Sequence, residues 1–302
     1  MPAPRLVIPG RHYLLSRRCL LRQFLLRASK ETKRILLYCL ARAAARTGVR
    51  VIAFLFMSNH YHAVVQDVEG RLPEFLEEFH KLAARALNAH LGRWENLWSA
   101  EPPCATHLVT DEDVFEKVLY TLGNPVSDHL VERVHHWPGA HSLDAMLSGE
   151  PIHTKRPEEF FRKEGPTPPE IKLQLIRPPG FEGHSQEEWA AYLKGRISEL
   201  ELRAHKERIE RGHGVLGKTA VLAASPFDGP RPSEPRRNLR PHIACKDPTL
   251  RVRAIRALQA FRRAYAKARE LLLQGTRNVV FPYGTYHMRL MGLSCAGPPL
   301  AC

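Results

Sequence analysis

The sequence predicts an α+β fold: a ferredoxin-like antiparallel sheet with helices packed against it, followed by a mostly helical, basic C-terminal region. Two observations lead to this prediction. Apolar patterning in the first half gives the order strand, helix, strand, strand, helix, strand, helix, which is typical of such a sandwich. In the second half, long segments of helical periodicity carry many arginines. We therefore expect one domain over residues 1–150 and a basic extension over residues 151–302.

The first elements follow from periodicity. Residues 12–18 read as a strand that ends in two arginines, and residues 31–46 have an apolar stripe at helical spacing. A second amphipathic helix is expected over residues 73–91, and residues 104–109 are expected to form a short fourth strand. The apolar stripe of the second helix is expected to lie in the core.

The most informative stretch lies between these helices, in residues 51–66. It reads as two strands, 51–56 and 61–66, joined through a polar Ser-Asn corner. Side chains two apart on a strand share a face, so His60 and His62 project together if the second strand begins by His60. Two neighbouring imidazoles can bind one divalent ion. The chain has 16 histidines, however, so the spacing alone also fits histidines without a metal, and a second element is needed.

That second element is a helix that begins at a capping pattern, Thr-Asp-Glu-Asp, in residues 110–113 and is expected to end before Pro125. On this helix, Tyr120 and Asn124 are four residues apart and therefore share one face. Two plainer interpretations stay open. Tyr120 could be a half-buried tyrosine without a chemical role, and Asn124 before a proline could be only a helix stop.

The extension contains fewer recognisable features. Residues 171–179 alternate and are expected to form a strand, and Ser185 begins a capping box before a long amphipathic helix. A Pro- and Arg-rich connector spans about residues 225–241. A last helix, from Asp247-Pro248 to Leu273, has an apolar stripe and a basic outward set, Arg251, Arg253, Arg256, Arg262, Arg263, Lys267 and Arg269. The basic set fits either a solvated face or a nucleic-acid contact.

Composition narrows the class of partner. The formal charge is +14, which favours a polyanion, most simply nucleic acid, although a ribosome-associated or membrane-surface protein would have the same excess. The six cysteines are scattered and include no Cys-x-x-Cys pair, which argues against a zinc ribbon or a disulfide scaffold and fits a reducing cytosol. No apolar run is long enough to predict a membrane span, and the first residues lack the apolar core of a signal peptide.

Two motifs together resemble the HUH-type tyrosine transposases, in particular the REP-associated branch. Met-Ser-Asn-His-Tyr-His, residues 57–62, is similar to that family's Met-Pro-Asn-His-x-His signature. Tyr-Thr-Leu-Gly-Asn-Pro-Val, residues 120–126, is similar to its tyrosine helix. The resemblance covers about residues 5–145. Ser58 replaces a proline, a change that a turn tolerates. Gly123 weakens the helix and is expected to give it mobility, and residues 99–101 replace a more basic stretch.

The resemblance implies an HUH endonuclease core and an activity. The protein would be a metal-dependent single-stranded DNA endonuclease and strand transferase of bacterial mobile elements, or a domesticated form, that acts through a 5′-phosphotyrosine intermediate. Tyr120 would be the nucleophile, and His60, His62 and Asn124 would bind Mg²⁺ or Mn²⁺. The substrate would be single-stranded DNA beside a hairpin or palindromic repeat. The candidate phosphate contacts are Arg11, Arg17, Arg18, Arg85 and Arg93.

Other readings stay open. A domesticated, non-catalytic DNA- or RNA-binding protein on the same scaffold would need none of the four site residues. A metal-binding oxidoreductase would leave the basic excess unexplained. With the leading reading we expect a cytoplasmic, nucleoid-associated bacterial protein that needs no membrane and acts as a monomer or a homodimer in DNA transposition or recombination.

Overall fold

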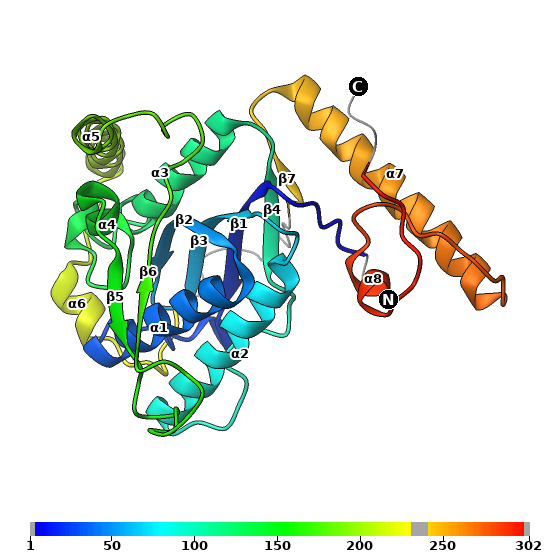
Figure 1. The fold of residues 1–302 in the computed structure, drawn as a ribbon. Coiled ribbons are helices and arrows are strands. Elements are labelled where there is room, and N and C mark those ends of the chain that lie inside the picture. The colour runs from blue at the N-terminus through cyan, green and yellow to red at the C-terminus, as the bar shows by residue number, and fades with distance from the viewer. Residues whose placement is uncertain (1–3, 231–240, 299–302) are drawn as a thin grey trace.

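The computed structural model describes residues 4–230 and 241–298. A layered α/β body fills most of the molecule, and one long helix runs away from it (Figure 1). The elements of the first half are β1 (Arg11–Arg18), η1 (Leu20–Arg22), α1 (Lys30–Thr47), β2 (Arg50–Phe56), β3 (His60–Asp67), α2 (Leu72–Leu91), β4 (Cys104–Leu108), α3 (Asp111–Ser127), η2 (Val134–His136) and α4 (Leu143–Ser148). Those of the second half are β5 (Ile152–Lys155), β6 (Glu170–Leu173), α5 (Gln186–Glu210), α6 (Lys218–Ala223), β7 (Ile243–Ala244), α7 (Pro248–Leu273) and α8 (Tyr286–Leu290).

The main sheet has the order β2-β3-β1-β4-β7. β1 to β4 pair antiparallel, and only the short β7 runs parallel to its neighbour β4. The first four strands, with α1 and α2 as their connections, have the ferredoxin-like order that the sequence predicted. The α+β fold class and the helical C-terminal region are therefore confirmed.

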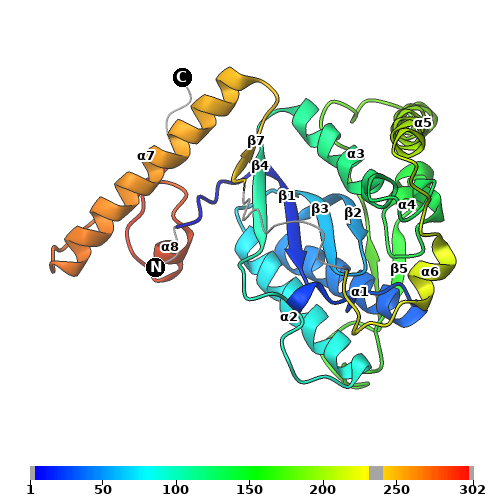
Figure 2. The ribbon, with the colours of Figure 1, turned by 180° about the vertical axis from the view of Figure 1, so that it is seen from behind.

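The two faces of the sheet bury different helices, as Figure 2 shows from behind. Side chains of alternate residues on β3 separate them. Tyr61, Ala63 and Val65 belong to a core formed with α1 and α2, whereas Val64 belongs to a core formed with α3, α4 and α5. The alternation places the side chains of His60 and His62 on the α3 face. The site that the sequence predicts therefore lies between the sheet and α3.

α3 is longer than predicted. Thr110 caps its start: the Thr110 Oγ1 accepts a hydrogen bond from the Asp113 backbone N–H (3.1 Å), as the capping pattern indicated. The prediction that the helix ends before Pro125 is wrong, because α3 continues through Pro125 to Ser127. A proline this close to the end removes only one backbone hydrogen bond. The following Val126 is fully buried, and its packing stabilises the last turn.

The second half of the chain packs against the sheet layers. α5, capped by Ser185 as expected, lies on α3, and Trp189, Leu193 and Ile197 join the core on that face. The expected strand over residues 171–179 is shorter than predicted, since β6 (Glu170–Leu173) ends at Leu173; it pairs with β5, and Leu175 beyond it makes an isolated bridge with Val51. Residues 231–240 of the Pro- and Arg-rich connector lie outside the described residues. A domain boundary at residue 150 stays a prediction.

No helix in residues 4–230 and 241–298 is both long and apolar enough to cross a membrane.

Candidate active site

His60 and His62 stand at the start of β3, directly after the corner that joins it to β2. The corner is closed by the Met57 backbone N–H, which donates to the carbonyl of His60 (2.9 Å). It is also held from outside, because the carbonyls of Ser58 and Asn59 accept hydrogen bonds from the backbone of Leu26 (2.9 Å) and Cys19 (2.8 Å). The segment around η1 therefore fixes the backbone on which both imidazoles are mounted.

Tyr120 and Asn124 project from α3 toward this corner. The Tyr120 ring lies against the His62 ring, with 5.2 Å between the centroids and 74° between the planes. The rings of His60 and His62 are 4.9 Å apart and close to perpendicular. Asn124 is buried, whereas Tyr120 is 45% exposed. The structure thus brings together all four residues that the motifs indicated, with only the tyrosine open to a large substrate.

The donor set fits a divalent cation. The Nδ1–H of His60 donates to Oδ1 of Asn59 (2.7 Å), which leaves the Nε2 lone pair of His60 as a possible ligand. Nδ1 of His62 and Oδ1 of Asn124 are both buried, and neither has a hydrogen-bond partner within the described part of the chain. Buried polar atoms are normally paired, so both atoms are available to a cation or to water.

The pKa values favour the metal-binding form of the imidazoles. Burial lowers the pKa of His60 to about 4; the nearby Arg18 contributes, and the Asn124 side chain opposes the shift. Burial also lowers the pKa of His62 well below its ordinary value, with further contributions from His60 and Arg18. Both rings are therefore neutral at pH 7, and a neutral imidazole has the lone pair that a metal needs.

No three His, Cys, Asp or Glu side chains within residues 4–230 and 241–298 lie close enough together to hold a metal ion. The candidate site does not contradict this finding, since the third ligand that the sequence predicted for it is an amide oxygen, that of Asn124, and not a His, Cys, Asp or Glu side chain. A set of two nitrogens and one oxygen suits Mn²⁺, and Mg²⁺ less well because it prefers oxygen ligands.

The environment of Tyr120 does not by itself activate the hydroxyl. Burial raises the pKa of Tyr120 above its ordinary value, Asp128 raises it further, and Arg18 opposes the shift. Lys117 places its ammonium 5.2 Å from the centre of the Tyr120 ring. Arg18 and Lys117 are therefore two cations close to the Tyr120 side chain. Lys117 was missed in the sequence, although its place three residues before Tyr120 on a helix is a usable signal.

The five arginines predicted to contact phosphate do not form one surface. Arg18 pairs with His60 across β1 and β3, so its side chain shares the face of the site. Arg17 points to the opposite face, where its guanidinium lies over the Trp98 ring at 5.6 Å, and with Arg85 it lines a surface hollow there. Arg11 lies at the other end of β1, paired with Asp67.

Arg93 has internal partners. It donates to Gln23 Oε1 (3.3 Å), its guanidinium lies 5.8 Å from the ring of Phe227, and only 9% of its side chain is exposed. Of the five arginines, Arg18 is therefore the one that the structure places at the candidate active site.

The structure is similar to that of a REP-associated tyrosine transposase bound to a REP hairpin, with 15% sequence identity and a TM-score of 0.42 over 55% of this chain and 99% of that chain. It is also similar to a candidate transposase from Deinococcus radiodurans R1, with 22% identity and a TM-score of 0.28 over 35% of this chain and 84% of that chain. No protein-family model and no curated protein matches the sequence. The solved structures similar to this chain thus include a tyrosine transposase, the family that its motifs resemble.

Proposed function

We propose that this protein is a metal-dependent single-stranded DNA endonuclease and strand transferase that acts through a 5′-phosphotyrosine intermediate. One observation carries the proposal: an exposed tyrosine lies in ring contact with one of two adjacent, neutral histidines, beside two buried polar atoms that lack partners. A protein that only binds DNA needs none of these features. The +14 charge supports a polyanionic substrate.

Each residue of the candidate site would have a role of its own. His60, His62 and Asn124 would hold the cation, and Asn59 would keep His60 in the tautomer that offers Nε2. When bound, Mg²⁺ or Mn²⁺ supplies positive charge that offsets the charge developing on the scissile phosphate. Arg18, on the same face, would contact that phosphate from the protein side.

Tyr120 would carry the covalent step. Its Oη attacks phosphorus, the Oη–P bond forms and the P–O3′ bond breaks. The tyrosine loses its proton and the departing 3′ oxygen gains one, so the products are a 3′-hydroxyl end and DNA joined to the protein through its 5′ phosphate. Because one phosphodiester replaces another, a second 3′-hydroxyl can reverse the step and join the strand elsewhere. The substrate that fits is single-stranded DNA beside a hairpin, where the phosphate is accessible.

The test uses single-stranded oligonucleotides from the repeats that flank the gene, labelled at the 5′ or the 3′ end, with Mn²⁺ or with a chelator. We expect a covalent protein–DNA adduct that carries only the 3′ label and that is absent with chelator. Tyr120→Phe should abolish the adduct. The matched control is Tyr192→Phe, since Tyr192 on α5 is exposed to a similar extent, 40%, and lies away from the site.

The possible results separate this proposal from its alternatives. An adduct that survives in Tyr120→Phe, or that carries the 5′ label, would overturn the assignment of the nucleophile or of the broken bond. Tight binding of the flanking DNA without cleavage, with Mn²⁺ bound, would favour the non-catalytic DNA-binding alternative instead.

A further inference from the structure

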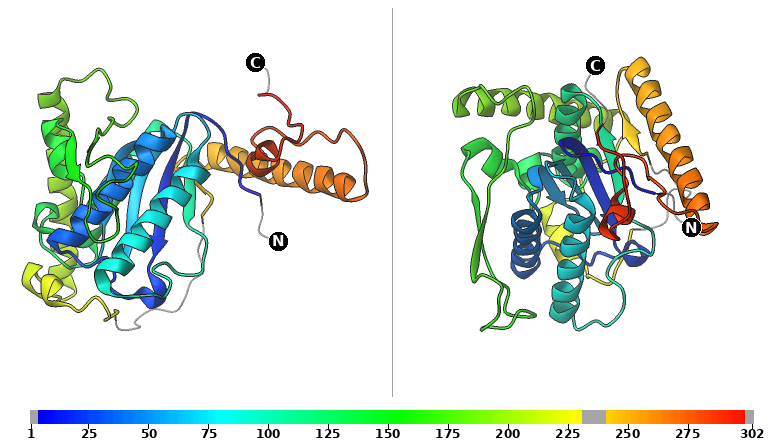
Figure 3. Two further views of the ribbon diagram at one scale, coloured as in Figure 1. Left: turned by 60° about the horizontal axis from the view of Figure 1, so that its bottom comes forward. Right: turned by 45° about the vertical axis from the view of Figure 1, so that its right-hand side comes forward.

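The chain has a basic surface on α7, well separated from the candidate active site along the strands. α7 starts directly after β7, which pairs with the His107–Leu108 end of β4, whereas Cys104 at the other end of β4 lies opposite Ser16, near the site. From there α7 runs away from the sheet, and the C-terminal segment that includes α8 lies beside it (Figures 1 and 3). Most of its length faces solvent: Phe261 and Ala268 are its only buried residues.

Six of the seven cations of α7 fall into two groups, and the seventh, Arg269, makes an interaction of its own and belongs to neither. Two of them bond back to the protein: Arg251 donates to the carbonyl of Cys245 (3.3 Å), and Arg262 to the ring of His242 (3.0 Å). A second group stands at helical spacing along one exposed stripe and is named here the α7 basic stripe. Its members are Arg253, Arg256, Arg263 and Lys267.

The α7 basic stripe lies on the side of the helix away from the packed residues. At 100° per residue its four positions fall within a sector of about 80°, whose centre lies about 120° around the helix from Phe261. None of the four makes an ion pair or a hydrogen bond with another described residue, and the single acidic residue within α7 is Glu270. Four like charges on one face of a helix repel one another when no opposite charge is paired with them. A bound polyanion would offset this repulsion.

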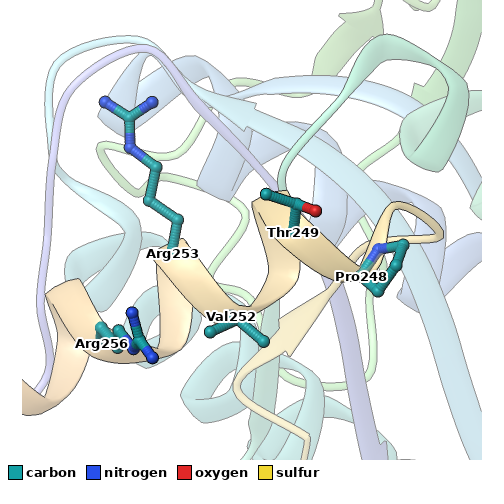
Figure 4. Close-up of a pocket in the computed structure, with 5 residues that line it drawn as sticks. All are labelled: Pro248, Thr249, Val252, Arg253 and Arg256. Carbon is teal, nitrogen blue, oxygen red and sulfur yellow. The ribbon is translucent and has the colours of Figure 1, made fainter.

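The dimensions fit the backbone of a duplex. From Arg253 to Lys267 the helix rises about 21 Å, and an α-helix of this length fits a major groove or lies along the phosphates beside it. At the N-terminal end of the stripe, Arg253 and Arg256 border a surface hollow of about 510 Å³, formed with Pro248, Thr249 and Val252 (Figure 4).

We infer that the α7 basic stripe binds the phosphate backbone of double-stranded DNA, beside the single strand that the active site processes. The choice of DNA rests on the proposed function. The choice of duplex rests on the absence of a stacking platform: the ring of Tyr265 packs on Phe281 and that of Phe261 is buried, so the stripe presents no aromatic face to unpaired bases. Contacts of this kind give affinity and salt dependence rather than sequence preference.

The test measures binding of a short, fluorescently labelled, blunt-ended DNA duplex by anisotropy, in chelator, at several salt concentrations between about 50 and 200 mM. The variant replaces the stripe, as R253Q/R256Q/R263Q/K267Q. The matched control removes four exposed cations from another helix end, as K194Q/R203Q/K206Q/R211Q on and directly after α5. Circular dichroism checks that both variants are folded.

We expect the stripe variant to bind the duplex at least about tenfold more weakly at 100 mM salt, with a salt slope smaller by about 0.9 for each side chain removed. The control should stay within about twofold of the wild type. Wild-type affinity in the stripe variant, or an equal loss in the control, would overturn the inference. The inference would also be overturned if the stripe variant lost affinity only for an RNA duplex or for anionic lipid vesicles.

The two proposals fail separately. Duplex binding in chelator does not require metal-dependent cleavage at Tyr120. If the stripe variant loses duplex binding while the wild type cleaves no substrate, the inference about the stripe stands and the proposed activity is wrong.

Discussion

Gly139→Ala is expected to destabilise the fold strongly, and the structure shows why. Gly139 lies where the indole N–H of Trp137 donates to the carbonyl of Phe56 (3.0 Å), at the end of β2. A Cβ on residue 139 would lie 2.6 Å from that carbonyl oxygen and in contact with the indole nitrogen. Neither group can move aside easily, since one is backbone and Trp137 is only 2% exposed.

The expected cost has two parts. Forcing a methyl group into a packed interior costs about 1 to 3 kcal/mol. Separating the indole from the Phe56 carbonyl leaves two buried polar groups unpaired, which costs about 1 to 3 kcal/mol more. We therefore expect the free energy of unfolding to fall by about 2 to 6 kcal/mol. Phe56 adjoins the corner that carries His60, so strand cleavage should fall as well.

Urea unfolding followed by circular dichroism measures the change. The matched control is Gly195→Ala, because Gly195 lies within α5 and a methyl group added there would meet no atom within 4 Å. There the better helix propensity of alanine should raise the free energy of unfolding by about 0.5 to 1 kcal/mol. A loss below about 1 kcal/mol in Gly139→Ala would refute the reasoning, since the contact would then be relieved without breaking the hydrogen bond.

Three further predictions follow from single contacts. Asn124→Ala should weaken Mn²⁺ binding about tenfold or more, measured by calorimetry without DNA, because one of three ligands is lost; unchanged affinity would remove Asn124 from the site. Arg93→Ala should lower the free energy of unfolding by about 1 to 3 kcal/mol, since Gln23 and the Phe227 ring lose their partner; a change confined to DNA affinity would contradict this internal role. Burial lowers the pKa of His107 to about 4, so the stability that its neutral form contributes is present above about pH 6.5 and is lost as the pH falls toward 4. His107→Gln should flatten that part of the pH profile, and an unchanged profile would contradict the shift.

Local patterns predicted most of the site. Alternation along residues 60–66 placed His60 and His62 on one face, and the four-residue spacing on α3 placed Tyr120 and Asn124 together. These rules depend only on neighbours in the chain, and β3 and α3 obey them. The end of α3 was predicted wrongly because a proline in the last turn costs little when Val126 is buried behind it.

Contacts between segments that are far apart in the chain could not be predicted from the sequence. Arg17 and Arg18 look equivalent as a pair of arginines, but their faces are opposite, and the register that sets Arg18 against His60 depends on how β1 meets β3. Arg93 bonds to Gln23 and packs on Phe227, which are 70 and 134 residues away. No local pattern indicates such partners, so a structural arginine and a DNA-binding arginine look the same in the sequence.

Gly123 shows how the extension takes part in the site. In the sequence this glycine suggested only a mobile tyrosine helix. In the structure a Cβ at residue 123 would lie 2.5 Å from Cδ1 and 2.8 Å from Cδ2 of Leu200, so Leu200 of α5 fills the space that a side chain at residue 123 would take. Arg196 of α5 adds an ion pair with Glu116 of α3 (3.5 Å), at the end of the helix that precedes Tyr120. α3 is thus held between the sheet on one side and residues from beyond position 150 on the other. The proposed nucleophile, Tyr120, therefore lies on a helix whose packing is not completed by residues 1–150 alone.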